Sequence, residues 1–164
     1  MQKGFATLEI IFTMMIIGVL IRFAVPKAST LIDTAALDYE TKRFYSELRF
    51  VQAMGRSTPN AIKGIDKTNI PPTTSPPALF IKRTENYYQV FKDTELKEGI
   101  REPHYFSNGV TIKLKNKNDQ NITINFDSEG KASINSDTLI LTSRLDKNKS
   151  VVVDSVGRIR GGDK

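Results

Sequence analysis

A long apolar segment lies near the start of the chain. Residues 5–21 read FATLEIIFTMMIIGVLI, a run of 17 residues in which Glu9 is the only charged position. Roughly 20 apolar residues, at about 1.5 Å rise each, span the hydrocarbon core of a bilayer, so this run is at the short end of membrane-spanning length. Arg22 follows it, and no later segment is comparably apolar. The pattern predicts an apolar N-terminal helix.

Helical periodicity continues beyond Pro26. Apolar or weakly polar positions recur at alternating steps of four and three residues, as on one face of a helix. These positions are Leu37, Thr41, Phe44, Leu48 and Val51. The charged residues between them are expected on the other faces: Glu40, Lys42, Arg43, Glu47 and Arg49. We therefore predict a single helix from Phe5 to about Met54, bent at Pro26.

Gly55 and Pro59 mark the expected end of this helix, because glycine follows many helix C-termini and proline cannot continue one. Residues 56–78 then hold five of the seven prolines of the chain. No periodicity survives in this segment. It is expected to form an exposed loop or a polyproline II spacer.

From residue 79 the hydrophobic period changes to two, the period of β-strands. Six short segments show it: 79–82, 87–91, 110–114, 122–126, 138–142 and 150–153. The pattern predicts an α+β fold, in which the long helix packs on an antiparallel β-sheet head. The polar stretches 115–120 and 127–130 lack the ligand spacing of a calcium loop, so ordinary hairpin turns are expected there.

Composition narrows the range of functions. The 164 residues include no cysteine and one histidine, His104, which excludes disulfides, thiolate metal sites and cysteine nucleophiles. The common catalytic and phosphate-binding motifs are absent from the sequence. His104 has no identifiable catalytic partner, so we expect no enzyme activity, metal or cofactor. The net charge of +6 permits an anionic partner without requiring one.

Two general explanations account poorly for the apolar segment. A secretory signal peptide would end in small residues at a cleavage site, but residues 22–29 read RFAVPKAS and offer no such site. A plain membrane anchor leaves Glu9 unexplained, because an acid at membrane depth costs roughly 2.5–3.5 kcal/mol. A carboxylate this early in an apolar run favours a functional role.

The N-terminus resembles the class III leader of type IV pilins and type II secretion pseudopilins. In that family a short basic leader ends in Gly, and Phe and Glu follow as the first and fifth residues of the mature chain. Here the leader is Met-Gln-Lys-Gly, residues 1–4, and Phe5 and Glu9 stand at the matching positions. The resemblance implies that a prepilin peptidase cuts between Gly4 and Phe5 and methylates the new amine of Phe5.

Two further positions agree with the family and one departs from it. Gly18 and Pro26 occupy the helix-weakening positions, whereas Arg22 stands where the family usually keeps an apolar residue. A leader of four residues is also short. The implied organisation is a cleaved leader (1–4), a membrane or filament-core half of the helix (5–28), an amphipathic half (29–55), a proline-rich loop (56–78) and the head (79–164).

Glu9 has two interpretations. The free amine of a processed chain and the Glu9 carboxylate are both costly in a bilayer or an apolar filament core. Pairing them between neighbouring subunits would neutralise both and set the register of assembly. Alternatively, Glu9 caps its own helix, where the dipole favours an acid by about 0.3–1 kcal/mol. Arg22 is expected to reach toward the membrane surface rather than toward Glu9.

Three segments of the chain resemble the GspH/FimT group of minor pilins and pseudopilins. They are residues 48–54 near the helix end and residues 126–132 and 151–160 in the head. Members of this group normally occur in few copies near a filament tip. The resemblance therefore implies a minor subunit, with a major pilin of the shaft as the less favoured alternative.

The C-terminal sequence Gly157-Arg158-Ile159-Arg160 matches the G-R-x-R motif of DNA-binding FimT proteins. On a strand, Arg158 and Arg160 would point to the same side, where their planar cations suit phosphate. Three nearby cations could add phosphate contacts: Arg144, Lys147 and Lys149. Alternatively, Gly-Arg-Ile is an ordinary ending of secretion pseudopilins, and the arginines form a solvated strand face.

The resemblance also implies partners and a location. The partners are other pilin or pseudopilin subunits, a prepilin peptidase, an inner-membrane assembly platform, membrane lipid before assembly and, in the DNA-uptake interpretation, DNA. The location is the bacterial inner membrane, as a single-pass protein with its head outside the cytoplasm, and then a pilus or pseudopilus. Protein secretion, a type IV pilus and DNA uptake all stay open at this point.

Overall fold

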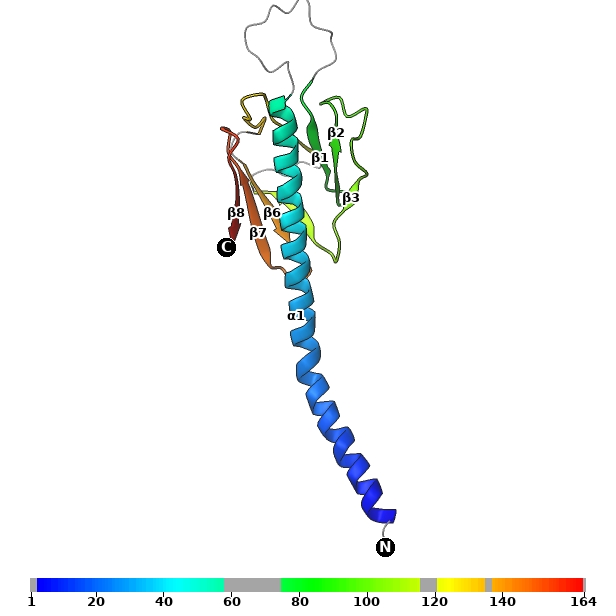
Figure 1. Cartoon of the computed structure of the whole chain (residues 1–164). Helices are drawn as coiled ribbons and strands as arrows, with labels where there is room; N and C mark the ends of the chain where they lie inside the picture. Colours follow the sequence, from blue (N-terminus) through cyan, green and yellow to red (C-terminus); the bar gives the residue numbers. More distant parts are fainter. Residues whose placement is uncertain (1–2, 58–74, 116–120, 135–136, 164) are drawn as a thin grey trace, which may run out of the picture.

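The computed structural model of the chain describes residues 3–57, 75–115, 121–134 and 137–163, and side chains from residue 8 to residue 161 within these ranges. Within these ranges one helix, α1 (Lys3–Ser57), precedes eight strands. The strands are β1 (Ala78–Lys82), β2 (Tyr87–Phe91), β3 (His104–Tyr105), β4 (Thr111–Leu114), β5 (Asn121–Asn125), β6 (Asp137–Thr142), β7 (Asn148–Val153) and β8 (Ile159–Asp163). Figure 1 shows α1 projecting far beyond the sheets at its N-terminal end.

The helix is continuous over 55 residues and passes through Gly18 and Pro26 without a break. Proline removes one backbone donor from a helix interior, so the hydrogen-bond ladder of α1 lacks one bond at Pro26. The axis of α1 curves gently along its N-terminal half (Figure 1). The predicted single helix is therefore confirmed over the described residues.

Gly55 does not end the helix, which continues to Ser57. A Cβ at Gly55 would lie 2.5 Å from the carbonyl oxygen of Phe126, so the glycine lets α1 approach the head closely at this point. The expectation that Gly55 stops the helix was wrong, because its lack of a side chain serves packing rather than chain reversal. Most of the proline-rich segment, residues 58–74, lies outside the described residues.

The strands form two antiparallel four-stranded sheets. The order is β3-β2-β1-β5 in one sheet and β4-β6-β7-β8 in the other. All six strands predicted from the period of two are present. Periodicity does not predict the other two strands. β3 has only two residues, and β8 reads IRGGD, in which adjacent glycines interrupt any alternation. The α+β prediction is confirmed.

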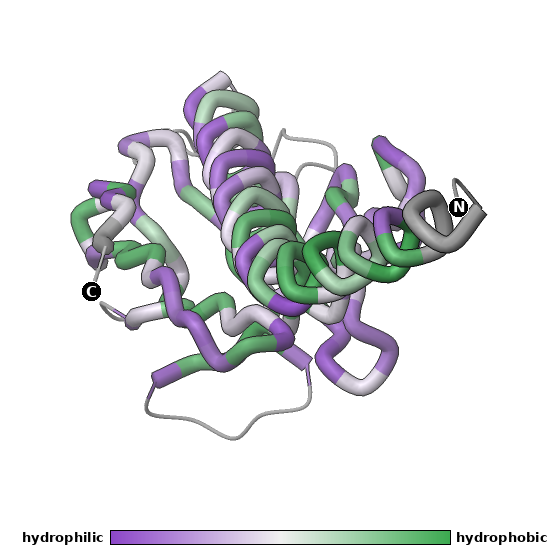
Figure 2. The backbone as a smooth tube through the Cα atoms, turned by 90° about the horizontal axis from the view of Figure 1, so that it is seen from below, coloured by the Kyte–Doolittle hydropathy of each residue, from purple (hydrophilic) through white to green (hydrophobic). Residues whose placement is uncertain are grey.

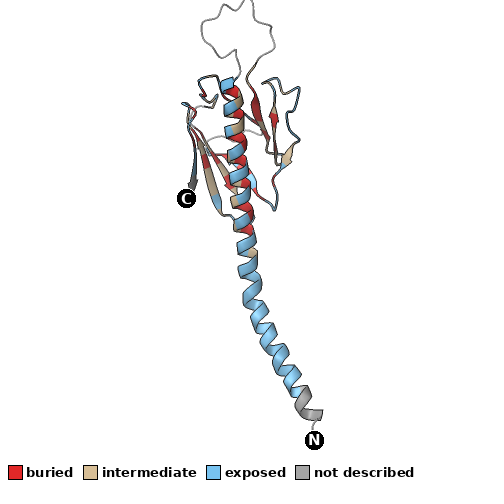
Figure 3. Cartoon of the chain, in the orientation of Figure 1, coloured by how far each residue is buried: buried red, intermediate tan, exposed pale blue. Residues whose placement is uncertain are grey.

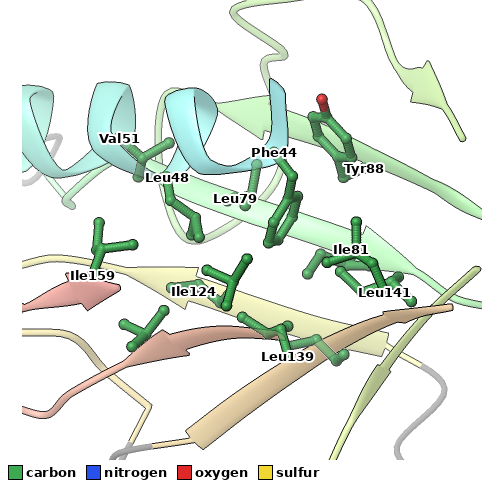
Figure 4. Packing of buried hydrophobic residues seen from close by; sticks show 14 of the residues in the cluster. Phe44, Leu48, Val51, Leu79, Ile81, Tyr88, Ile124, Leu139, Leu141 and Ile159 are labelled. Atoms are coloured by element: carbon green, nitrogen blue, oxygen red, sulfur yellow. The ribbon is translucent and has the colours of Figure 1, made fainter. Parts of the chain in front are cut away.

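The core lies between the second half of α1 and the inner faces of both sheets (Figure 4). Every apolar member of the predicted helix stripe is buried, with Phe44, Leu48 and Val51 fully enclosed. They pack against residues that alternate along the strands: Leu79, Ile81, Ile124, Leu139, Leu141 and Val151. Burying each such side chain contributes roughly 1.5–3 kcal/mol, so this face fixes the helix on the head.

Candidate functional site

The N-terminal half of α1 extends beyond the head, which it meets where Arg144 donates to Ser29, and exposes a long apolar surface. From Leu8 to Ile32 its large apolar side chains are each between 52% and 71% exposed. Figure 2 shows the hydrophobic colouring of this half, and Figure 3 shows that it is exposed, whereas the second half also carries buried residues where it faces the sheets. This part of α1 is long and apolar enough to cross a membrane.

Glu9 lies within this apolar surface and is itself exposed. Arg22 is on the same helix, about 20 Å further along the axis at 1.5 Å per residue, so the two side chains cannot pair within one chain. The sequence-predicted processing position, Gly4–Phe5, falls in the first turns of α1, where the side chains lie outside the described residues. Among the described side chains of α1, Glu9 therefore has no cation within reach.

A second region of interest is the far end of the head, where two hairpin turns of nearly the same sequence meet. Residues 127–131 read DSEGK and residues 154–158 read DSVGR. In each turn the glycine N–H donates to the aspartate carbonyl oxygen, at 2.9 Å and 2.8 Å. Both glycines have a positive φ, +79° and +82°. The prediction of an ordinary hairpin turn at 127–130 is confirmed.

Gln52 joins the two turns to α1. Its side-chain amide donates to the carbonyl oxygens of Gly130 at 3.0 Å and Gly157 at 2.5 Å. A Cβ at Gly157 would collide with the Gly130 carbonyl, so only glycine permits this contact between turns. The segments that resemble the GspH/FimT group, one helical and two in the head, therefore meet at one junction of three hydrogen-bonded residues.

Arg158 and Arg160 leave this junction on the same side. Both are exposed, while Ile159 between them is buried. Arg160 pairs in register with Val152 and lies 3.4 Å from the Asp154 carboxylate, a long and solvent-exposed ion pair. Such a pair contributes little stability, so Arg160 can exchange it for another anion. The expectation that the two arginines share a side agrees with this burial pattern.

Two further cations, which the sequence pattern did not single out, come near the junction that holds Arg158 and Arg160. The Arg56 guanidinium lies against Gly130, and Lys131 follows that glycine and pairs with Glu129. Within the described residues neither Arg56 nor Arg158 forms an ion pair. The sequence held one signal for Lys131. The D-S-x-G motif occurs twice and is followed by a cation each time, and two turns of the same geometry place their fifth residues in the same way.

The other three cations proposed for phosphate contact lie elsewhere. Arg144 donates to Ser29 at 3.3 Å, Lys147 donates to Thr34 at 2.5 Å, and Lys149 lies 2.7 Å from Asp38. These α1 residues are about 20 Å or more along the helix from Gln52. The expectation that they join Arg158 and Arg160 was wrong. Arg144 and Lys147 stand in the β6–β7 turn, at the opposite end of the strands, and Lys149, in β7, is turned toward Asp38 of α1.

Two acids of α1 are buried, contrary to the expectation that charged residues occupy solvent faces. Glu40 is fully buried and Glu47 is 7% exposed. Glu40 accepts hydrogen bonds from the Ser107 backbone N–H at 3.1 Å and the Ser107 hydroxyl at 2.5 Å, and its second oxygen lies 2.8 Å from His104 Nε2. These bonds compensate the loss of water around the carboxylate.

Glu47 binds the segment that comes just before β3. Its Oε1 accepts from Arg101 at 2.6 Å, and the Arg101 guanidinium stacks over the Phe50 ring at 4.1 Å. Glu40 and Glu47 are seven residues apart, two helical turns, so both face the segment that flanks β3. The two carboxylates fasten that segment to the helix.

The Glu40 cluster differs from a nucleophile–base–acid relay. Ser107 and His104 both contact the carboxylate, and neither contacts the other. A base that activates a serine must reach its hydroxyl directly. Among the described residues no three His, Asp or Glu side chains gather as metal ligands. The arrangement performs a structural task that sequence pattern alone did not reveal.

Sequence comparisons give no relative: no protein-family model matches the chain, and no curated protein does. Comparison with solved structures does find similar proteins. Two crystal forms of the type IV minor pilin FimU from Pseudomonas aeruginosa strain PAO1 share its architecture. The P21 form superposes with a TM-score of 0.53 at 12% identity over 82% of this chain and 90% of that one. The P65 form gives 0.50 at 12% identity over 79% and 91%. The chain therefore has a type IV pilin-like fold.

Proposed function

We propose that this chain is a structural subunit that assembles through α1 into a pilus or pseudopilus. The observation that carries the proposal is the apolar half-helix, exposed from Leu8 to Ile32 and interrupted by Glu9, which projects from a well-packed head. Such a surface requires a cover, since contiguous exposed apolar area marks a membrane or protein contact. Lipid covers it before assembly and the helices of other subunits cover it afterwards. The pilin-like fold supports this arrangement.

Processing and pairing follow from the same surface. A prepilin peptidase would cut after Gly4, and the methylated amine of Phe5 would approach Glu9 of a neighbouring subunit. Arg22 lies too far along the helix to neutralise Glu9, and we propose the amine of a neighbouring chain as its partner. In an apolar surrounding, a charge left unpaired is strongly unfavourable, so the pair selects one register among many.

The experiment replaces Glu9 with Val in cells that assemble the filament. Membrane insertion of Glu9→Val should be unchanged or improved, while its incorporation into filaments falls at least tenfold, as measured by quantitative immunoblotting of sheared filaments. Glu95→Val, at a solvent-exposed acid of the head, is the matched control and should incorporate normally. Normal incorporation of Glu9→Val would overturn the assembly proposal.

DNA binding by the head is the second candidate function, as in DNA uptake. It is favoured by two exposed arginines, Arg158 just before β8 and Arg160 within it, with Arg56 close to the same junction. Few phosphates could be contacted, so binding by one head should be sequence-independent and weak, in the range of roughly 10⁻⁴–10⁻⁶ M, and should weaken steeply as salt rises.

The test titrates labelled duplex into the full chain in detergent at low salt. The double variant Arg158→Gln/Arg160→Gln should weaken binding of every duplex alike and flatten the salt dependence. The double variant Arg144→Gln/Lys147→Gln removes the same charge from the opposite end of the strands and should change binding much less. Absence of any binding at high micromolar protein would remove this candidate and leave a secretion or pilus subunit.

A further inference from the structure

The lower end of the head, from which the N-terminal half of α1 projects (Figure 1), holds cations that neither proposed function uses. The turn between β6 and β7, residues 143–147, meets α1 at this end. Arg144 donates to Ser29 at 3.3 Å, and Lys147 donates to Thr34 at 2.5 Å. The turn thus fixes two cations against the side of the helix, where the exposed apolar half of α1 ends.

Each of these cations stands above a cation of α1 on the same helix face. Arg22 is seven residues before Ser29, and Lys27 is seven residues before Thr34. Seven residues make almost two helical turns, so the two positions of each pair lie on one face, about 10 Å apart along the axis. Both α1 cations are exposed. The two pairs of cations are Arg22 with Arg144 and Lys27 with Lys147.

Few acids oppose these four cations. Among the described residues, Asp146 is the exposed acid within the turn itself. On α1, Asp33 is 4% exposed and Glu40 is fully buried, while Asp38 already has an ion pair. In the β1–β2 turn, at the same end of the strands, Glu85 also has one. The lower end of the head therefore keeps a positive surplus, which suits an anionic partner.

The positions of these cations along α1 match the surface of a membrane. A hydrocarbon core of about 30 Å takes up roughly 20 residues of helix, so a helix that enters it at residue 5 leaves it near residue 24. Arg22 and Lys27 both lie within about 5 Å of that level. The headgroup layer extends roughly a further 5–7.5 Å, as far as Ser29 with the Arg144 guanidinium. Arg22 and Arg144 therefore lie on either side of the layer that holds the lipid phosphates.

Lys147 lies higher, at the level of Thr34. That level is about 15 Å above the hydrocarbon core and about 8 Å above the headgroup layer. The Debye length at physiological ionic strength is also about 8 Å, so an anionic membrane surface still attracts this ammonium group. The Lys pair therefore adds attraction to the surface, whereas the Arg pair is placed for direct contact.

We propose that the lower end of the head binds the phosphate of an anionic phospholipid between Arg22 and Arg144, with Lys27 and Lys147 on an adjacent side of the helix. The proposal rests on the proposed function, because it requires α1 to lie in a membrane before assembly. Arginine donates to phosphate through two parallel hydrogen bonds, and two flexible arginines can close a gap of about 10 Å around one phosphate. Arg22, which departs from the usual apolar residue of the pilin pattern, would thereby gain a task.

The test uses the full chain in vesicles of phosphatidylcholine alone, or of equal parts of phosphatidylcholine and phosphatidylglycerol. The chain contains no cysteine, so a spin label can be attached at one introduced site. Leu145→Cys labels the β6–β7 turn, where Leu145 is 45% exposed, and Val156→Cys labels the turn at the other end of the strands, where Val156 is 64% exposed. Accessibility to a water-soluble nickel complex then reports how near each label lies to the membrane surface.

The Leu145 label should lose about half or more of its accessibility in the anionic vesicles relative to the neutral ones, because the anionic surface attracts the turn. The Val156 label should be equally accessible in both. At a salt concentration of about 1 M the difference at Leu145 should disappear for the part that is not direct contact, since the Debye length falls to about 3 Å.

Paired substitutions show which cations are responsible. Arg22→Gln/Arg144→Gln should remove the difference between the two vesicle types at the Leu145 label. Lys42→Gln/Arg49→Gln is the matched control, because these two residues are also exposed cations of α1 that lie seven residues apart, but they lie in its second half. This control variant should keep the full difference.

A third label separates this proposal from the proposed function. Phe12 is 59% exposed on the apolar half of α1, and a label at Phe12→Cys should be reached by oxygen and hidden from nickel in both vesicle types. With that label in the hydrocarbon, equal accessibility of the Leu145 label in the two vesicle types would overturn the lipid proposal alone. A difference that survives Arg22→Gln/Arg144→Gln would do the same. A Phe12 label in water would overturn both proposals.

Discussion

At the residue scale, the buried acids of α1 show where sequence pattern stops being informative. Glu40 and Glu47 fall on the same stripe as Phe44, yet their charge alone argued for solvent. Their burial depends on Ser107, His104 and Arg101, which are 54 to 67 residues away along the chain. No local pattern encodes such partners, whereas the apolar positions of the same stripe were predictable because burial is their default.

Tyr88 gives the residue-scale prediction, which concerns pH. Because burial raises the pKa of Tyr88, the unfolded chain releases this proton near pH 10, before the folded chain does. The associated stability is fully present below about pH 10 and falls above it, by up to about 1.4 kcal/mol per pH unit. Tyr88→Phe should lack this alkaline loss.

Urea unfolding of the full chain in detergent, followed by circular dichroism between about pH 8 and 11, measures the effect. Tyr105→Phe is the control, since Tyr105 is 58% exposed, and it should keep the alkaline loss of the unmodified chain. Parallel pH profiles for the unmodified chain and Tyr88→Phe would contradict the assignment of the shifted group to Tyr88.

At the element scale, the turns carry information that the strands do not. Alternation predicted six strands, but it missed β8, because adjacent glycines leave no apolar pattern, and β3, because two residues cannot show a period. The glycine of each D-S-x-G turn was readable as a turn residue. That the two turns touch, through Gly130 and Gly157 under Gln52, follows only from the packing of distant segments.

Gly157→Ala tests this junction. The substitution adds a Cβ where the Gly130 carbonyl lies and forces a positive φ on alanine, so we expect a loss of at least ~2 kcal/mol in unfolding free energy. Gly161→Ala is the matched control, because nothing lies within 4 Å of the added Cβ, and it should change stability by less than about 0.5 kcal/mol. Equal stability of the two variants would mean that the turns do not touch.

At the scale of the whole molecule, the two halves of α1 have different tasks. The second half stabilises the head by packing in its core, and the first half offers an exposed apolar surface for contacts outside the head. The apolar run, the amphipathic stripe and the α+β class were predictable, because each rests on a period within a continuous segment. Of the four cations near the Gln52 junction, the sequence predicted only Arg158 and Arg160, which stand in a recognisable motif. Arg56 and Lys131 come near that junction only through the fold.

Two phenylalanines of α1 test this division. Phe44→Ala should lower the unfolding free energy of the head by about 3–5 kcal/mol, because Phe44 is fully enclosed. Phe12→Ala, at a position 59% exposed, should leave that free energy unchanged within about 0.5 kcal/mol. Thermal unfolding of both full-length variants in detergent provides the comparison, and a similar loss in both would show that the N-terminal half contributes to the head.

The unbroken course of α1 from the apolar surface into the core has a mechanical consequence. Its backbone hydrogen bonds lie nearly parallel to the axis, so tension along α1, as in the proposed filament, would load them directly in series. The sheets are attached sideways, along the second half of the helix alone, and are largely bypassed by that tension. Extension would then begin near Pro26, where one hydrogen bond of the ladder is already missing, while the head keeps its shape under load.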